Sequence, residues 1–166
     1  GMNFTALDLD RIDLSGVDLR GLVLDRSNLP RSSLKNALLN GVSMIGANLR
    51  EVDLTGAVLA NANLSEAEAQ DAIFNQADLT GAYLYGAMLD DAGFREANLS
   101  HADLSHASLN NARFVKAKLE NAQMNSTKLK GANFSEAVLS KTTLYGAYLE
   151  HANMARANLH EAYMEG

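Results

Sequence analysis

Large apolar residues recur at every fifth position along the whole chain. The register Phe4–Met164 holds 33 residues: 23 Leu, 5 Phe, 4 Met and a single exception, Ala69. In a helix, a five-residue spacing turns each residue by about 140° from the last and scatters the set around the cylinder. In a strand, an odd spacing sends successive residues to opposite faces. The pattern therefore predicts a backbone that itself repeats every five residues, as a short extended segment followed by a bend.

The bends are marked by Gly. Of the 12 Gly residues, 11 stand two places after the central apolar residue, and only Gly93 departs from this register. The second central residue of a type II turn needs a positive φ, which Gly adopts readily. The only Pro, Pro30, stands one place earlier, where its fixed φ suits the first central position. Asn is the next most tolerant residue and shares the Gly position at Asn36, Asn61, Asn111 and Asn121.

A second period of 20 residues predicts how many units close one coil. Sorting the central residues by 20 separates an aromatic column from a column of pure Leu, as expected if four units complete a square turn. Thirty-three units then give about eight coils, and the rod would be roughly 40 Å long at ~4.8 Å per coil. Ala stands two places before each central residue from Ala57 to Ala162, apart from Thr127 and Thr142, because a second inward side chain must be small. The predicted core columns are Phe74, Phe94, Phe114, Phe134 and Leu19, Leu39, Leu59, Leu79, Leu99, Leu119, Leu139, Leu159.

Units such as Ala47-Asn48-Leu49, Ala77-Asp78-Leu79 and Ala132-Asn133-Phe134 resemble the A-(D/N)-L-x-x motif of the pentapeptide repeat family. The resemblance covers essentially the whole chain. It implies an all-β fold, a right-handed quadrilateral parallel β-helix, here one domain over residues 2–166 with Gly1 as a remnant of an expression tag. Some members of that family bind DNA gyrase as mimics of duplex DNA and protect it from quinolones. They use an acidic rod built on a C-terminal dimer.

Two places depart from the repeat. In the first coil, Leu7, Ile12, Val17 and Leu22 replace the small inward residue. They either close the open end of the rod or stack on another molecule, for instance in an end-to-end homodimer. At Ala69 the central Leu is lost, so we expect a cavity, an outward bend, a binding notch or simply a drifted repeat.

Charge is unevenly distributed. Glu51–Phe94 contains eight acidic residues and no Lys or Arg. The 20-residue register places several of them side by side, where like charges about 5 Å apart repel unless a cation or a basic partner surface compensates. The alternative is a solvated patch of weakly coupled charges. The candidate partner-binding acidic patch is Glu51, Glu66, Glu68, Asp71, Asp90 and Asp91. A basic stretch follows at Arg113, Lys116, Lys118, Lys128 and Lys130, and Glu96, Lys116, Glu136 and Arg156 alternate in sign at another corner.

Other chemistry finds little support in the sequence. There is no Cys, no basic segment before an apolar run and no apolar stretch long enough to span a membrane, so we expect a cytoplasmic protein. The net charge of −6 disfavours direct nucleic-acid binding. The four His residues fall at or near bends without metal-ligand spacing. We therefore expect no catalytic residue, cofactor or metal, and no enzymatic activity.

The sequence predicts a rigid, non-catalytic scaffold that binds a protein partner. Mimicry of DNA towards gyrase is the alternative. Against mimicry stand the modest net charge, the basic stretch after the acidic one, and the expectation that no helix follows the last repeat.

Overall fold

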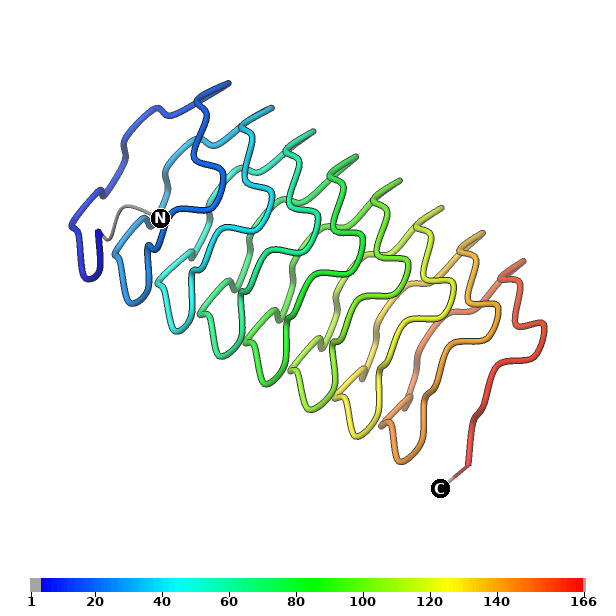
Figure 1. Ribbon diagram of the computed structural model, residues 1–166. Helices are drawn as coiled ribbons and strands as arrows, with labels where there is room; N and C mark the ends of the chain where they lie inside the picture. Colours follow the sequence, from blue (N-terminus) through cyan, green and yellow to red (C-terminus); the bar gives the residue numbers. More distant parts are fainter. Residues whose placement is uncertain (1–3, 166) are drawn as a thin grey trace.

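The computed structural model describes residues 4–165, which form one continuous coil wound into a square rod (Figure 1). The path is a right-handed quadrilateral β-helix of eight turns, and the two ends of the chain lie at opposite ends of the rod. Within residues 4–165 there is no helix, and the β-structure consists of single-residue bridges between successive coils. The predicted fold class is confirmed.

Four ladders of parallel bridges define four faces. Every bridge joins a residue to the one 20 positions later, so four pentapeptides complete each turn, as predicted. Face A follows the bridge residues Asp8–Tyr148, face B Asp13–Asn153, face C Asp18–Asn158 and face D Val23–Tyr163. On each face the bridge residue and the residue two places later point outward, and a corner residue completes the unit.

The unit that begins at Asn98 shows how the backbone is satisfied. The Asn98 N–H donates to the Ala77 carbonyl in the preceding coil at 2.9 Å. The Leu99 and His101 N–H groups donate to the following coil, at 2.7 and 2.9 Å. The Ala102 N–H closes the turn on the Leu99 carbonyl at 3.0 Å. Because each coil is bonded to both neighbours, the short extended segments need no wider sheet.

Every corner has a residue with positive φ, as the Gly register predicted. These residues run from Ala6 to Glu161 with φ between 54° and 70°; nine are Gly and 23 are not. The residue before each of them has no positive φ, which is the signature of a type II turn. The left-handed conformation costs a non-Gly residue roughly 1–2 kcal/mol. The corner N–H donates to the next coil at almost every turn, and this bond offsets the cost.

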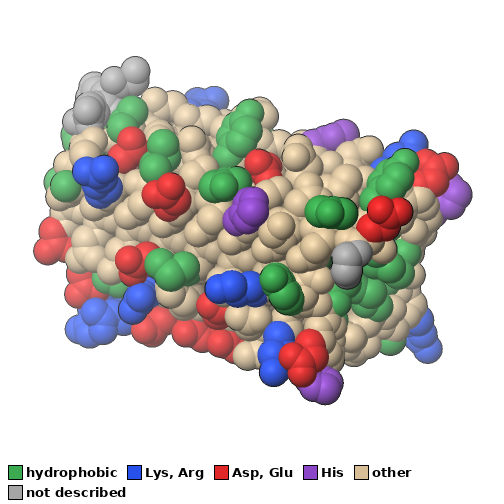
Figure 2. Space-filling model, turned by 90° about the horizontal axis from the view of Figure 1, so that it is seen from below, with side chains coloured by type: hydrophobic (Ala, Val, Ile, Leu, Met, Phe, Trp, Pro, Cys, Tyr) green, Lys and Arg blue, Asp and Glu red, His purple; other side chains and the backbone are tan. Residues whose placement is uncertain are grey.

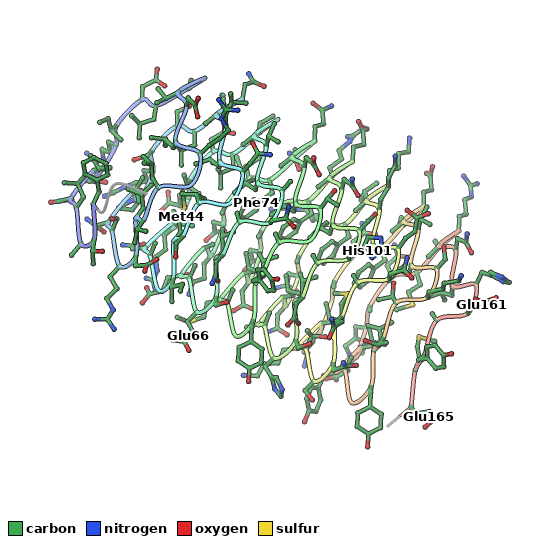
Figure 3. All side chains as sticks on the ribbon, in the orientation of Figure 1. Met44, Glu66, Phe74, His101, Glu161 and Glu165 are labelled. Atoms are coloured by element: carbon green, nitrogen blue, oxygen red, sulfur yellow. The ribbon has the colours of Figure 1, made fainter. Side chains whose placement is uncertain are left out.

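The central residues fill the interior as four columns. Phe74, Phe94, Phe114 and Phe134 are fully buried and stack with ring centroids 4.7–4.9 Å apart and planes within 4°. That spacing is the rise per coil. The Leu column of face C is fully buried from Leu39 to Leu139. Figure 3 shows Met44 and Phe74 inside the coil and Glu66 pointing away at a corner.

Within residues 4–165, the first coil leaves its end of the rod open. Leu7 is 39% exposed and Val17 37% exposed. Together with Phe4, Leu9, Leu14, Leu19, Leu22 and Leu24, Leu7 lines an apolar hollow. The larger inward side chains narrow this mouth without filling it.

At Ala69 neither the bend nor the open notch is present. Ala69 is fully buried, and its N–H donates to the Met88 carbonyl at 2.7 Å, as in a regular unit. The next central residue in the same coil, Phe74, is larger than Leu54, which stands one coil earlier in the Phe74 column. In the next three coils a buried Leu stands beside a buried Phe in the same two columns, so Phe74 does not by itself require the small side chain of Ala69.

Candidate functional site

The six residues of the acidic patch lie on face A and its two corners. Glu68 and Asp90 are outward residues of face A itself. Glu51, Asp71 and Asp91 follow one another, coil by coil, at the corner between faces A and B, which we call the acidic corner. Glu66 lies at the other corner of face A, between faces D and A. In Figure 2, acidic side chains gather along the lower edge of the visible surface, with Lys and Arg among them at its left end.

Two of the six residues are already engaged within the fold. Glu68 forms an ion pair with Arg50 at 3.1 Å, across adjacent coils. The Asp90 carboxylate accepts hydrogen bonds from the Ser108 hydroxyl and from the backbone and side-chain N–H groups of Asn110, at 2.8–2.9 Å. Arg50 stands one residue before Glu51–Phe94, the stretch that lacks basic residues. Its pairing with Glu68 makes the net negative charge at this surface smaller than the composition of the stretch indicates.

At the acidic corner, the Arg113 guanidinium donates to the Asp91 backbone carbonyl at 3.0 Å, but the carboxylates themselves have no such partner. Among residues 4–165, Glu51, Asp71 and Asp91 take part in no ion pair. Their corner conformation, with φ of 56–62°, directs them away from the coil. Carboxylates one coil apart repel by less than about 1 kcal/mol in water, so the fold tolerates the stack without a bound cation. The corner is therefore a preformed line of negative charge.

The charge along the rod is banded. Residues 26–45 contain three basic residues and no acidic one, residues 66–105 contain eight acidic residues and one basic one, and residues 106–145 contain six basic residues and two acidic ones. Residues 46–65 are also net negative, as are residues 4–25 and 146–165, so two positive bands interrupt an otherwise negative rod.

The alternating corner is only partly paired. Lys116 and Glu136 form an ion pair at 3.8 Å. Glu96 instead contacts its chain neighbour Arg95 at 3.3 Å and accepts a hydrogen bond from Gln76. The hydrogen bonds from Gln76 and then Arg95 lower the pKa of Glu96.

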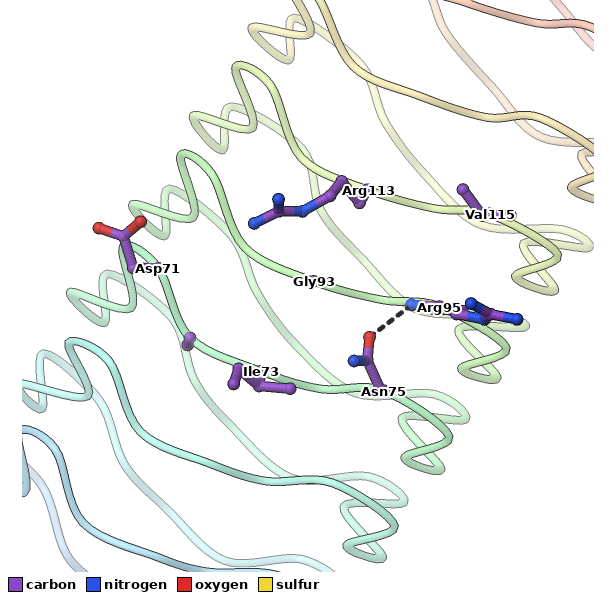
Figure 4. Close-up of a pocket in the computed structure, with 8 residues that line it drawn as sticks. Asp71, Ile73, Asn75, Gly93, Arg95, Arg113 and Val115 are labelled. Atoms are coloured by element: carbon purple, nitrogen blue, oxygen red, sulfur yellow. Dashed lines mark hydrogen bonds between the residues drawn. The ribbon is translucent and has the colours of Figure 1, made fainter.

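A hollow of about 330 Å³ adjoins the acidic corner on face B (Figure 4). It forms because Gly93 places no side chain between Ile73 and Arg113, its neighbours in the bridge ladder. A Cβ at Gly93 would lie 3.2 Å from Asn75 Oδ1, the atom that accepts the Arg95 N–H at 2.9 Å. Gly93, the one Gly outside the turn register, thus leaves room for the hollow.

Other site chemistry is sparse in the described part of the chain. His101, His106 and His151 occupy corner positions, and His160 stands one place before a corner. No group of three or more His, Asp or Glu side chains within residues 4–165 is arranged to hold a metal ion. Over the same residues, no helix is long and apolar enough to cross a membrane.

Comparison with known families gives two matches that together cover most of the chain. The family described as "Pentapeptide repeat region" matches residues 49–124, and "Pentapeptide repeats (8 copies)" matches residues 18–56 and 132–166. The chain belongs to the pentapeptide repeat family. A search of curated proteins found no match.

Solved pentapeptide repeat structures share its fold. HetL is a pentapeptide repeat protein involved in heterocyst differentiation regulation from the cyanobacterium Nostoc sp. strain PCC 7120. It is 26% identical over 98% of this chain and 89% of HetL, with a TM-score of 0.53. Full-length QnrB1, a plasmid-mediated fluoroquinolone resistance protein, is 18% identical over 99% of this chain and 94% of QnrB1, with a TM-score of 0.58. At that identity the likeness to QnrB1 shows the fold alone.

Proposed function

We propose that this pentapeptide repeat protein is a rigid, non-catalytic scaffold that presents its acidic corner to a basic surface of a partner protein. The observation that carries the proposal is the stack of Glu51, Asp71 and Asp91, which has no ion-pair partner within residues 4–165. Glu66 and Asp90 border the same surface.

The fold suits this role because the charges are positioned before any partner arrives. Each carboxylate sits on a turn bonded to the neighbouring coil, so the backbone loses little freedom on binding. A preformed line of like charge attracts a complementary surface at a distance and sets the orientation of the encounter. HetL is described as involved in heterocyst differentiation regulation, and a regulatory role for a scaffold agrees with that description.

Mimicry of DNA towards gyrase is the second candidate, favoured by the acidic band and by the shared fold with QnrB1. Mimicry needs negative potential along most of the rod. Two positive bands, at residues 26–45 and 106–145, interrupt the negative charge along the rod, so a local docking surface fits better.

Capture of partners by immobilised protein tests the proposal. Glu51→Lys/Asp71→Lys/Asp91→Lys reverses the acidic corner. Asp78→Lys/Glu120→Lys/Glu136→Lys makes the same change in net charge on face C and its corner with face B, away from faces A and D, and serves as the control. A protein retained by the wild type and the control but lost from the corner variant, and then confirmed with purified components, supports the proposal. Equal retention by all three contradicts it.

Gyrase supercoiling, measured with increasing amounts of this protein with and without a quinolone, separates the two candidates. Inhibition or protection that is lost in the corner variant makes mimicry the function. No effect at tens of micromolar removes it.

A further inference from the structure

Face D differs in chemistry from the other three faces. Between Ser43 and Glu165 it has 14 outward positions, of which only Asp103 and Glu165 are charged, and Ser105 is buried. These positions are Ser43, Ile45, Asn63, Ser65, Tyr83, Tyr85, Asp103, Ser105, Gln123, Asn125, Thr143, Tyr145, Tyr163 and Glu165. Over the same coils, faces A and B each carry several charged outward residues.

Four of the five Tyr residues of the chain lie on this face. Tyr83, Tyr85, Tyr145 and Tyr163 are 48–67% exposed, so their rings do not serve the core. They form two groups: Tyr83 and Tyr85 in one coil, and Tyr145 and Tyr163 in two adjacent coils near the C-terminal end. The fifth, Tyr148, lies just beyond the corner at Gly146 and extends the second group.

Tyr, Ser and Asn are enriched in the loops with which antibodies bind proteins, and Lys is depleted from protein interfaces. Tyr supplies a large contact area at low cost in side-chain entropy, and short polar side chains supply adaptable hydrogen bonds. The Tyr85 ring also packs edge-on against His106, with centroids 5.2 Å apart, which holds it in place.

The spacing of these groups selects the shape of the ligand. The coils of Tyr85 and Tyr145 are three steps apart, about 14 Å at the repeat of the ladder. Asp103 lies one step from the first group, about 5 Å along the rod. A helix rises about 1.5 Å per residue and repeats a face at i, i+4, i+7 and i+11. Along such a helix, a residue at i+4 lies about 6 Å and one at i+11 about 16 Å from the first.

We infer that face D docks an amphipathic helix of a partner protein, lying along the rod. The helix places apolar residues at i and i+11 on the two Tyr groups and a Lys or Arg at i+4 opposite Asp103. A polar residue at i+7 faces the amide side chains of Gln123 and Asn125. The inference rests on the proposed scaffold role but uses a different surface from the acidic corner.

A displayed library of helical peptides, randomised at i, i+4, i+7 and i+11 in an Ala/Glu/Lys background, provides the probe. Wild-type protein should enrich peptides with apolar residues at i and i+11 and Lys or Arg at i+4. Synthetic versions of these peptides should bind the Tyr83→Ser/Tyr85→Ser/Tyr145→Ser/Tyr163→Ser variant at least tenfold more weakly. Because the rings are exposed, that variant should keep the wild-type circular dichroism spectrum and melting temperature.

Two further variants make the result specific. Asp103→Asn should weaken binding of the basic peptides about two- to fivefold and remove the preference at i+4, as expected for an exposed ion pair. The variant Glu51→Lys/Asp71→Lys/Asp91→Lys should bind these peptides like the wild type, so that failure of the acidic corner and failure of face D are distinguishable.

The inference is overturned if no peptide is enriched over the Tyr-to-Ser variant, or if the enriched peptides show no preference at i+4. It is also overturned if a neutral soluble glucan, and no peptide, binds the wild type and is lost from that variant.

Discussion

Replacing Phe114 with Leu tests what the stacked rings add to the rod. Phe114 lies between Phe94 and Phe134, with centroid distances of 4.8 and 4.7 Å and nearly parallel planes. These centroid distances lie within the range of interacting aromatic pairs. Leu occurs naturally in this column at Leu14, Leu34 and Leu54, which makes it the mildest change.

The structure gives the size of the effect by comparison with Phe134. Phe114→Leu removes two ring pairs, whereas Phe134→Leu removes one, because Met154 is the next residue in its column. An aromatic pair contributes about 0.5–1.5 kcal/mol beyond its buried area. The loss of buried area is common to both substitutions and cancels. Phe114→Leu should therefore lower the free energy of unfolding by about 0.5–1.5 kcal/mol more than Phe134→Leu does.

Urea unfolding followed by circular dichroism measures this difference, provided the slope with urea is unchanged. In a double-mutant cycle, Phe94→Leu and Phe114→Leu should couple by about 0.5–1.5 kcal/mol. Phe94→Leu and Phe134→Leu, two coils apart, should be additive. Equal losses at Phe114 and Phe134 with no coupling would show that the rings contribute only through their buried area.

Three further predictions concern the core, a corner and a surface carboxylate. Ala69→Leu should raise the free energy of unfolding, because each of the next three coils buries a Leu beside a Phe in the same two columns. A loss of about 1–3 kcal/mol in urea unfolding would show instead that this coil has no room for the added side chain. Gly41→Ala should lower the free energy of unfolding by about 1 kcal/mol because of the positive φ alone, since a Cβ there meets nothing within 4 Å. Gly131→Ala should lower it further because its Cβ would lie 2.6 Å from Asn111 Oδ1. Adding Asn111→Ala should remove this additional loss, which urea unfolding measures. The side-chain and backbone hydrogen bonds from Arg20 lower the pKa of Asp18 to about 2, so its contribution to stability is present above the ordinary pKa and lost as pH falls through 2. NMR titration should show Arg20→Gln raising that pKa towards the ordinary value, and an unchanged pKa would mean that Arg20 is not the cause.

Much of the fold follows from the sequence because one short period controls it. The central register, the Gly corners and the 20-residue columns each depend on identical units bonded to identical neighbours. What the period does not determine is how an irregular unit relaxes. Ala69 keeps its ladder bond and its burial although the central Leu is lost. The first coil remains open because its larger residues have no coil above them among the described residues.

The surface was predicted less completely. Arg50 pairs with Glu68, which lies 18 residues later and therefore in the next coil. Arg50 stands one residue before Glu51–Phe94, the stretch whose composition predicts the acidic patch. Face D becomes visible only when outward residues are sorted by face, since its Tyr residues are scattered between Tyr83 and Tyr163 along the chain. Gly93 was noticed as an exception, but its relation to Asn75 needs the neighbouring coil.

The most direct test of the central claim is the affinity of a captured, purified partner for wild-type protein, for the acidic-corner variant and for the charge-matched control, each at several salt concentrations. If Glu51, Asp71 and Asp91 form the docking surface, wild type and control should bind equally and weaken together as salt rises, while the corner variant binds at least tenfold more weakly. Equal affinities for all three proteins, or binding indifferent to salt, would contradict the account.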